Sequence, residues 1–263
     1  MWPGHERNAL IGHTGFVGSN LARGVHFSHL YNSSNFRQMR EVQFDTVVCA
    51  GVSAAKWKAN LDPVSDWEQI SALIAELATI KARRFILIST VDVYPDTSLP
   101  LDEAADIGGE LHAYGAHRLR LEEFVATTFE RSAIVRLPAL FGPGLKKNAL
   151  FDLINDHEVD RINPNGIFQW YPVGRLVDDL AIVDRHGLSR VNLVTEPIAL
   201  RAIWERYFLR RPIPEIAAPG AQYRLRSKYA DLFGGRGFYC MDADEVMAEL
   251  GAFVGEGTGL RAD

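Results

Sequence analysis

The stretch Asn8-Ala-Leu-Ile-Gly12-His-Thr-Gly15-Phe-Val-Gly18-Ser-Asn-Leu-Ala decides the fold of this chain. A short apolar run comes first, and three glycines in the spacing G-x-x-G-x-x-G lead from it into residues suited to a helix. Gly12 allows the tight turn out of the strand, Gly15 lets a pyrophosphate approach the backbone, and Gly18 lets the helix pack against the sheet. Amide groups at the start of such a helix meet the negative charge of a phosphate. The stretch therefore predicts a dinucleotide-binding turn, with Gly12, Thr14, Gly15, Phe16, Val17 and Gly18 as its contacts. A glycine-rich turn that binds nothing is the alternative.

The residues that follow alternate between short apolar strands and helix-like stretches. Near-continuous apolar strands are typical of a parallel sheet that is covered on both faces. The predicted strands are Asn8–Ile11, Phe44–Ala50, Arg84–Thr90, Ser132–Leu137 and Ser189–Val194. Apolar residues recur at helical spacing over Pro63–Lys81, Tyr114–Thr128 and Leu176–Val183. This order predicts an α/β fold with a doubly wound parallel sheet of the Rossmann type.

The alternation becomes less regular after the loop Gly142-Pro-Gly144. We therefore expect residues 1–142 and 171–196 to form the dinucleotide-binding Rossmann domain. Residues 143–170 and 197–263 are expected to form a small substrate-binding lobe towards the C-terminus. A chain of 263 residues is long enough to bury the core that such an arrangement needs.

Composition excludes several classes of partner. The net charge of −5 leaves no basic footprint for nucleic acid or for an anionic membrane surface. No window approaches the roughly 18 consecutive apolar residues of a membrane span, and the N-terminus lacks the apolar segment of a signal peptide. The two cysteines and eight histidines form no metal-ligand spacing. We expect a reduced, cytoplasmic protein without a metal ion, and a disulfide between the cysteines is not favoured.

Three further segments join the glycine turn. They are Cys49-Ala-Gly51, Ile88-Ser-Thr-Val-Asp-Val-Tyr-Pro95 and Tyr114-Gly-Ala-His-Arg118, followed by Val135-Arg-Leu-Pro138, Phe141-Gly-Pro-Gly144 and Tyr171–Leu180. In this order the motifs resemble the extended short-chain dehydrogenase/reductase superfamily, and within it the NAD-dependent epimerase/dehydratase branch. The resemblance covers about residues 8–195. It implies an NAD(P)-dependent enzyme but identifies no substrate.

The resemblance implies a catalytic pair of Thr90 and Tyr114. Thr90 would hydrogen-bond a substrate oxygen, and Tyr114 would exchange a proton with it while hydride moves to or from the nicotinamide. The family has a lysine four residues after the tyrosine, where this chain has Arg118. Arginine keeps the positive charge but cannot relay a proton, so redox turnover is less certain, and a mere helix-surface pair of Tyr114 and Arg118 is the alternative. Asp92 stands where related sugar-nucleotide dehydratases carry two acids, so we rank a dehydratase below an epimerase or reductase; capping a turn is an equal alternative for Asp92.

The choice of cofactor depends on the end of the second strand. NAD-specific sites place a carboxylate there to bind the ribose diol. The corresponding stretch, residues 30–35, has no carboxylate, and Arg37 and Arg40 follow it, which favours NADP slightly over NAD unless these arginines lie on a solvated helix face. Only about 30 residues separate Gly18 from Cys49, where the family fits two strands and two helices, so one strand–helix pair is compressed or lost. The remaining predicted cofactor contacts are Asn32, Ser33, Cys49, Ala50, Gly51, Tyr114, Arg118 and Leu137.

Lys146 and Asn148 follow the Gly-Pro-Gly loop, and Arg175 precedes the last helix of the Rossmann pattern. By resemblance these residues would bind the diphosphate of a nucleotide sugar, although solvated loop charges explain them equally well. The favoured function is therefore an NAD(P)-dependent epimerase or reductase that acts on a nucleotide sugar or a related polyol. The alternatives are a non-catalytic NAD(P)-binding sensor or scaffold, and a reductase or isomerase for a small substrate without a nucleotide. A homodimer through Trp67 and Phe124 is a further expectation.

Overall fold

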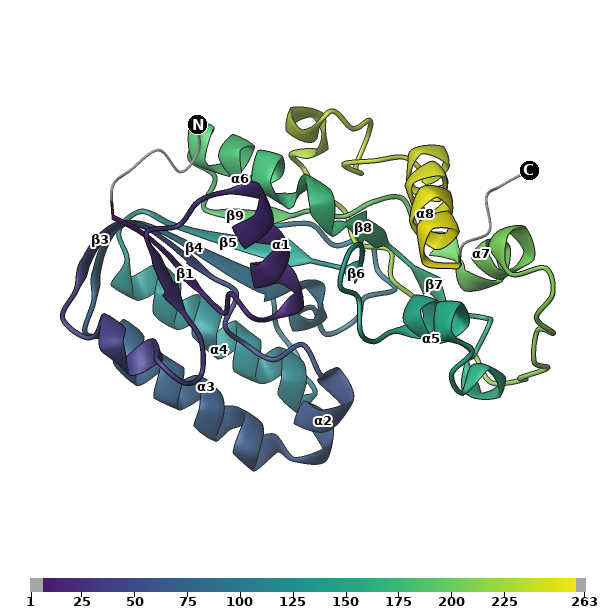
Figure 1. The fold of residues 1–263 in the computed structure, drawn as a ribbon, viewed down its shortest axis with the longest axis horizontal. Helices are drawn as coiled ribbons and strands as arrows, with labels where there is room; N and C mark the ends of the chain where they lie inside the picture. Colours follow the sequence, from purple (N-terminus) through teal and green to yellow (C-terminus); the bar gives the residue numbers. More distant parts are fainter. Residues whose placement is uncertain (1–6, 259–263) are drawn as a thin grey trace. The chain divides into compact units, whose positions relative to one another are not determined.

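One six-stranded sheet organises the first part of the fold (Figure 1). Its strands are β1 (Asn8–Ile11), β2 (His29–Tyr31), β3 (Gln43–Cys49), β4 (Lys81–Thr90), β5 (Ser132–Leu137) and β9 (Arg190–Asn192). They follow the order β2-β1-β3-β4-β5-β9, and the pairs β1–β2, β1–β3 and β3–β4 run parallel. The predicted α/β fold with a Rossmann-type sheet is confirmed. The chain leaves β1 towards β2 on one side and returns to β3 on the other, and ligands of such sheets bind at this reversal.

The computed structural model describes residues 7–258, and these fall into two units. The first contains residues 7–95, 105–136 and 176–191, and the second contains residues 96–104, 137–175 and 192–258.

The connection between Gly18 and Cys49 is as short as the sequence indicated. After β2 the chain makes one turn of 3-10 helix, η1 (Phe36–Met39), and then enters β3. The side of the sheet beyond β1 therefore holds β2 alone. This confirms that one strand–helix pair of the family pattern is lost, and it places Asn32 directly after the second strand.

Helices cover both faces of this sheet. Figure 1 shows α3 (Pro63–Leu77) and α4 (Ala113–Thr128) on one face and α1 (Phe16–Gly24) and α6 (Leu176–Arg185) on the other. The short α2 (Lys56–Leu61) precedes α3. Asp62 caps α3 by accepting a hydrogen bond from the Ser65 amide, and Pro63 suits its first turn. The sequence predicted that this helix extends to Lys81, which is wrong: the Lys81 amide donates to Val42 O and begins β4.

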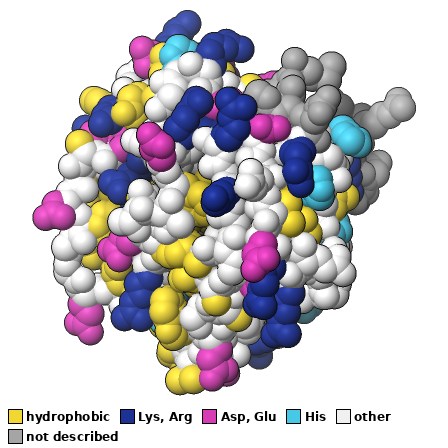
Figure 2. Space-filling model, turned by 90° about the vertical axis from the view of Figure 1, so that its left-hand side faces the viewer, with side chains coloured by type: hydrophobic (Ala, Val, Ile, Leu, Met, Phe, Trp, Pro, Cys, Tyr) yellow, Lys and Arg dark blue, Asp and Glu magenta, His cyan; other side chains and the backbone are white. Residues whose placement is uncertain are grey.

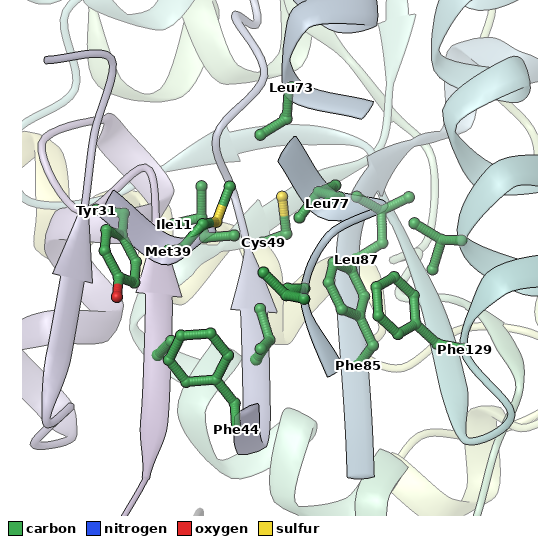
Figure 3. Packing of buried hydrophobic residues seen from close by; sticks show 14 of the residues in the cluster. Ile11, Tyr31, Met39, Phe44, Cys49, Leu73, Leu77, Phe85, Leu87 and Phe129 are labelled. Carbon is green, nitrogen blue, oxygen red and sulfur yellow. The ribbon is translucent and has the colours of Figure 1, made fainter. Parts of the chain in front are cut away.

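The core beneath α3 and α4 is apolar and tightly packed (Figure 3). Phe85 on β4 stacks on Phe129 with ring centroids 4.2 Å apart. Cys49 lies in the same cluster, and burial raises the pKa of its thiol to about 11, so it stays protonated and inert. Trp67 and Phe124 are partly buried against this core. Their role in a homodimer stays a prediction.

The second unit has its own core and shorter strands. Its helices are α5 (Ala149–Asn155), α7 (Leu200–Tyr207) and α8 (Ala243–Thr258); its strands are β6 (Ala139–Phe141), β7 (Ile167–Phe168), β8 (Trp170–Pro172) and β10 (Ile198–Ala199). Trp170 and Trp204 are almost fully buried among the apolar side chains of this unit. Glu103 ties residues 96–104 to the unit, because its carboxylate accepts hydrogen bonds from Asn192 N, Ser227 Oγ and Lys228 N.

The surface drawn in Figure 2 carries side chains of both charges. On the face drawn in Figure 2, basic and acidic side chains are interspersed with apolar ones. In the part of the chain that the structure describes, no helix is both long and apolar enough to cross a membrane. Across residues 7–258 no three His, Cys, Asp or Glu side chains are grouped to hold a metal ion, and Cys49 and Cys240 form no disulfide there.

Candidate active site

The glycine turn connects β1 to α1 with the geometry that the spacing suggested. Gly12 has a φ of +88°, and a Cβ there would lie 2.3 Å from Ala50 O, so only glycine fits. A Cβ at Gly18 would lie 2.1 Å from Gly12 O, whereas one at Gly15 would meet only Gly12 O at 3.3 Å. The close packing therefore lies behind the turn, and Gly15 is exposed.

The start of α1 suits an anion. Gly15 is its N-cap, no side chain caps it, and no acidic residue lies in its first turn. The first amides of a helix have no partner within the helix and carry partial positive charge. The His13 ring braces the turn, with Nδ1 2.9 Å from Tyr31 O at the end of β2. His13 is a contributor that the glycine spacing did not reveal.

The end of β2 carries amides and hydroxyls. Asn32 Oδ1 accepts hydrogen bonds from Ser34 N and Ser34 Oγ, and Asn35 Oδ1 accepts one from Asn32 N. Ser33 is exposed. These bonds hold the loop in one conformation without a carboxylate.

The two arginines after this loop differ in their contacts. Arg40 donates through Nε and Nη2 to both carboxylate oxygens of Glu76 on α3, at 3.0 and 2.6 Å. Arg37 is exposed, with its guanidinium carbon 6.0 Å from the centroid of the Phe36 ring. Arg37 is therefore the better candidate for contacting a phosphate.

Thr90, Asp92 and Tyr114 come together where β4 ends and α4 begins. Thr90 Oγ1 accepts a hydrogen bond from Asp92 N at 3.1 Å and lies 3.4 Å from Asp92 Oδ2. The approach of α4 is close: a Cβ at Gly115 would lie 2.2 Å from Asp92 O. The Tyr114 amide donates to Asn60 Oδ1 at 3.0 Å. Thr90 and Tyr114 are both buried, which is the environment that proton transfer between a phenol and a substrate requires.

The surroundings of Tyr114 raise the pKa of its phenol above the usual value of 10. Burial is the largest cause, and the charges of Asp92 and Asp66 act in the same direction. The charge of Arg118 and a hydrogen bond with Thr90 lower the pKa, but they do not outweigh burial. Tyr114 is therefore a protonated phenol at neutral pH.

Arg118 is buried and held by a fork of hydrogen bonds. Its Nη1 donates to Asp66 Oδ2 at 2.5 Å and to Tyr114 O at 3.2 Å, and its Nη2 donates to Asp66 Oδ1 at 2.9 Å and to Ser53 O at 2.7 Å. A guanidinium has five N–H donors, so these bonds use every Nη proton. Nε is buried and has no hydrogen-bond partner among the described residues. The guanidinium carbon lies 3.9 Å from the centroid of the Tyr114 ring. The pair is thus not a helix-surface pair.

Two residues that the sequence did not single out also contact this cluster. Lys56 at the start of α2 donates from Nζ to Asp92 Oδ1 at 2.7 Å. His112 is the N-cap of α4, and its Nδ1 accepts from the Gly115 amide at 3.1 Å. Burial lowers the pKa of His112, followed by the positive charge of Lys56, while Asp92 opposes them. Lys56 lies 36 residues before Asp92 along the chain, so no spacing could have indicated their contact.

A buried hydrogen-bond network joins the segments that carry Thr90 and Tyr114. Glu122 on α4 accepts from Ser89 Oγ at 2.5 Å and from Arg136 Nη2 at 2.6 Å. Arg136 Nη1 donates to the Tyr94 hydroxyl at 2.9 Å. Glu122 and Arg136 are 1% and 0% exposed, and their ion pair joins α4 to β5. The hydrogen bonds of Ser89 and Tyr94 connect this pair to β4 and to the chain that follows it.

The other predicted contacts have varied surroundings. Cys49 is the last residue of β3, and Ala50 and Gly51 follow it beside the turn, where the Ala50 amide donates to Ile11 O. Leu137 is buried and belongs to the second unit, as do Lys146, Asn148 and Arg175.

Lys146 is exposed. Asn148 has a φ of 123°, caps α5 by accepting from Phe151 N, and donates to Leu140 O. Arg175 donates to Phe233 O at 2.9 Å. The hydrogen bonds of Asn148 therefore stabilise its own loop, whereas the Lys146 side chain lies at the surface.

The sequence matches the NAD dependent epimerase/dehydratase family over residues 9–161. Among curated proteins none matches the chain. Three similar solved structures have TM-scores of 0.73, 0.73 and 0.72 and identities of 17%, 16% and 13%. They are RMD from Pseudomonas aeruginosa complexed with NADPH, the NAD-dependent NDP-hexosamine 5,6-dehydratase TunA of tunicamycin biosynthesis, and a UDP-N-acetylglucosamine 4-epimerase from Methanobrevibacter ruminantium M1. The alignments cover 96%, 98% and 94% of this chain and 99%, 99% and 96% of those chains.

Proposed function

This chain belongs to the NAD-dependent epimerase/dehydratase family, and we propose that it is an epimerase or reductase for a nucleotide sugar or a related polyol. The observation that carries the proposal is the buried contact set of Thr90, Asp92 and Tyr114 at the carboxyl end of β4. A threonine and a protonated tyrosine that share a buried position can orient and protonate one substrate oxygen.

The glycine turn fits the pyrophosphate of NAD(P). The N-terminus of α1 has uncapped amides, and Gly15 leaves room for close approach. Asn32 and Ser33 would contact the adenosine ribose. Arg40 already binds Glu76, so Arg37 is the arginine that would contact the 2′-phosphate of NADP, and it favours NADP over NAD. When bound, NAD(P) would accept or donate the hydride.

Within the chain, Tyr114 holds the proton that the reaction needs. Its raised pKa keeps the phenol protonated at neutral pH, so Tyr114 is prepared to act as an acid. Thr90 would orient the substrate oxygen towards it. Asp66 and Ser53 keep the Arg118 guanidinium over the ring face, where a cation stabilises negative charge that develops on the phenol.

The second unit would bind the rest of the substrate. We propose residues 143–170 and 197–263 as the substrate lobe and residues 1–142 and 171–196 as the Rossmann domain. Lys146 would contact the diphosphate, and Arg175 would do so from a guanidinium already anchored to Phe233 O. Asn148 would act indirectly, because its hydrogen bonds to Leu140 O and Phe151 N hold the loop that leads into α5. Relatives of similar fold include enzymes for NDP-hexosamine and UDP-N-acetylglucosamine, which supports a nucleotide sugar.

The test is oxidation of NADPH and NADH by the purified protein with UDP- and dTDP-linked keto sugars, and epimerisation of UDP-glucose and UDP-N-acetylglucosamine. We expect turnover with at least one of these substrates. Tyr114→Phe should lose about 1,000-fold in kcat while it binds NADPH normally, since general acid catalysis contributes about 10²–10⁴. Unchanged turnover in Tyr114→Phe would contradict the roles given to these residues.

A second candidate is a non-catalytic NAD(P)-binding protein. The observation in its favour is that all Nη protons of Arg118 are donated in hydrogen bonds to acceptors within the protein. Micromolar NADPH binding without hydride transfer to any sugar nucleotide of the panel would support this candidate. Detection of transfer would exclude it.

A further inference from the structure

A continuous series of polar groups leads from the exposed end of Lys56 to the buried phenol of Tyr114. Lys56 Nζ donates to Asp92 Oδ1 at 2.7 Å, Asp92 Oδ2 lies 3.4 Å from Thr90 Oγ1, and Thr90 hydrogen-bonds Tyr114. The Lys56 side chain is 39% exposed, whereas that of Asp92 is 13% exposed. The series therefore begins at a partly exposed side chain and ends at the phenol that is proposed to react.

The chemistry requires such a connection. Once Tyr114 has given its proton to a substrate oxygen, it is a buried phenolate and must regain a proton before the next turnover. Arg118 is its nearest cation, but a guanidinium does not release a proton at accessible pH. Its Nη protons also point to Asp66, Ser53 O and Tyr114 O. The proton must reach Tyr114 by another route.

We propose that Lys56, Asp92 and Thr90 form the proton relay that resupplies Tyr114, in place of a lysine at position 118. This inference rests on the proposed function in the reducing direction. The Thr90 O–H bond breaks and its proton goes to the Tyr114 phenolate, while Thr90 takes a proton from the Asp92 carboxyl group. Asp92 has taken that proton on Oδ1 from the Lys56 ammonium, and rotation of the carboxyl group turns it towards Thr90. The neutral Lys56 amine then takes a proton from water. The net result is one proton moved from solvent to Tyr114.

The other charged groups near this series do not compete for the role. Asp66, packed from α3, is already paired with Arg118 and His117. His112, at the start of α4, holds the Gly115 amide with Nδ1, so its protonation would cost α4 its cap. Lys56 has a flexible ammonium with three donors, which can turn between Asp92 and water.

The decisive comparison is Lys56→Arg with Lys56→Met. Arginine keeps the charge and can keep an ion pair with Asp92, but it cannot release a proton. If Lys56 relays protons, both variants lose about 100-fold in kcat for reduction of the UDP-linked keto sugar, as expected for a lost acid–base group. If Lys56 only positions Asp92, Lys56→Arg keeps the wild-type kcat, and the relay is wrong.

Three further measurements accompany this comparison. Lys58→Met removes the same charge from the same helix at an exposed position and should keep the wild-type rate. NADPH affinity, measured by fluorescence titration, should be unchanged in every variant and shows that each is folded. Lys56→Ala should regain rate with added ethylamine, which restores a proton donor in place of the lost ammonium group. Failure of ethylamine rescue would contradict the relay.

The relay and the proposed function fail in different ways. Wild-type protein that transfers no hydride to any sugar nucleotide refutes the function, and the relay with it. Wild-type protein that turns over beside an equally active Lys56→Arg refutes the relay alone.

Discussion

Replacing Arg118 with the lysine of the family pattern should destabilise this protein. The guanidinium spans both oxygens of Asp66 and also reaches Ser53 O. A lysine ammonium is a point charge and can hold one carboxylate oxygen at a time. Arg118→Lys therefore keeps part of the Coulomb attraction but loses two charge-assisted hydrogen bonds, each of which contributes about 1.5–3 kcal/mol. Because water and His117 compensate in part, we expect the free energy of unfolding to fall by about 2–4 kcal/mol.

Denaturation experiments measure this loss directly. A loss of that size corresponds to a decrease in Tm of roughly 4–16 °C, at about 2–4 °C per kcal/mol. Arg118→Met should cost about 3–5 kcal/mol, because it leaves a buried carboxylate without its main partner. The double variant Asp66→Asn/Arg118→Met should cost less than the sum of its single changes. If Arg118→Lys is as stable as the wild type, the fork to Asp66 does not stabilise the fold and the reasoning fails.

The same pair predicts a pH dependence. Burial pushes the pKa of Asp66 up, but the hydrogen bonds and charges of Arg118 and His117 hold it below the ordinary value of 3.8. A carboxyl group with a lowered folded pKa stabilises the protein above its unfolded pKa, and this contribution disappears as the pH falls through the folded value. The stability of the wild type should therefore fall at acidic pH, below about pH 4. Arg118→Met, measured by urea denaturation across the same pH range, should show a smaller fall.

Three other changes test other parts of the structure. Arg37→Ala should weaken NADPH binding about tenfold in calorimetric titration, because it removes one charge-assisted contact, and should leave NADH binding unchanged. Arg40→Ala serves as the control. An equal loss of affinity for both cofactors would contradict the role of Arg37. Glu122→Gln should lower the free energy of unfolding by about 3–5 kcal/mol in urea denaturation, because it leaves Arg136 as a buried charge without its partner, and a loss below 1 kcal/mol would contradict the network. Gly115→Ala should abolish keto-sugar reduction while NADPH binding persists, because its Cβ would meet Asp92 O at 2.2 Å and move α4; retained turnover would show that this approach is not required.

The sequence predicted those parts of the fold and of the candidate site that local patterns encode. The glycine spacing located the turn from β1 to α1, and helical periodicity located α4 with Tyr114 near its start. The missing strand–helix pair could be counted from the distance between Gly18 and Cys49. Each of these features depends on neighbours within about 30 residues, as local propensity and turn chemistry do.

The partners of the site could not be predicted in this way. Asp66 and Arg118 lie 52 residues apart, and Lys56 and Asp92 lie 36 apart. The packing of α3 against α4 brings Asp66 to Arg118, and α2 brings Lys56 to Asp92 directly after β4. A charged residue on a helix is predicted to lie on a solvated face when its partner is unknown. Arg40 followed the predicted cofactor loop and was a possible phosphate contact, but its guanidinium binds Glu76 on α3, a partner that is distant in the sequence. The exact end of α3 depended on the sheet hydrogen bond of Lys81.

The arrangement of charges around Tyr114 bears on the direction of the reaction. Arg118 faces Asp66 and Lys56 faces Asp92, so the positive charges near the phenol are each balanced by a carboxylate. Arg118 and the Thr90 hydrogen bond lower the pKa of Tyr114, but burial, Asp92 and Asp66 keep it raised. An epimerase needs its tyrosine to take a proton as readily as it gives one, whereas a reductase needs only donation and resupply. A protonated phenol, backed by a lysine that reaches solvent, suits the second requirement. Within the proposed function, the side chains therefore favour a reductase over an epimerase.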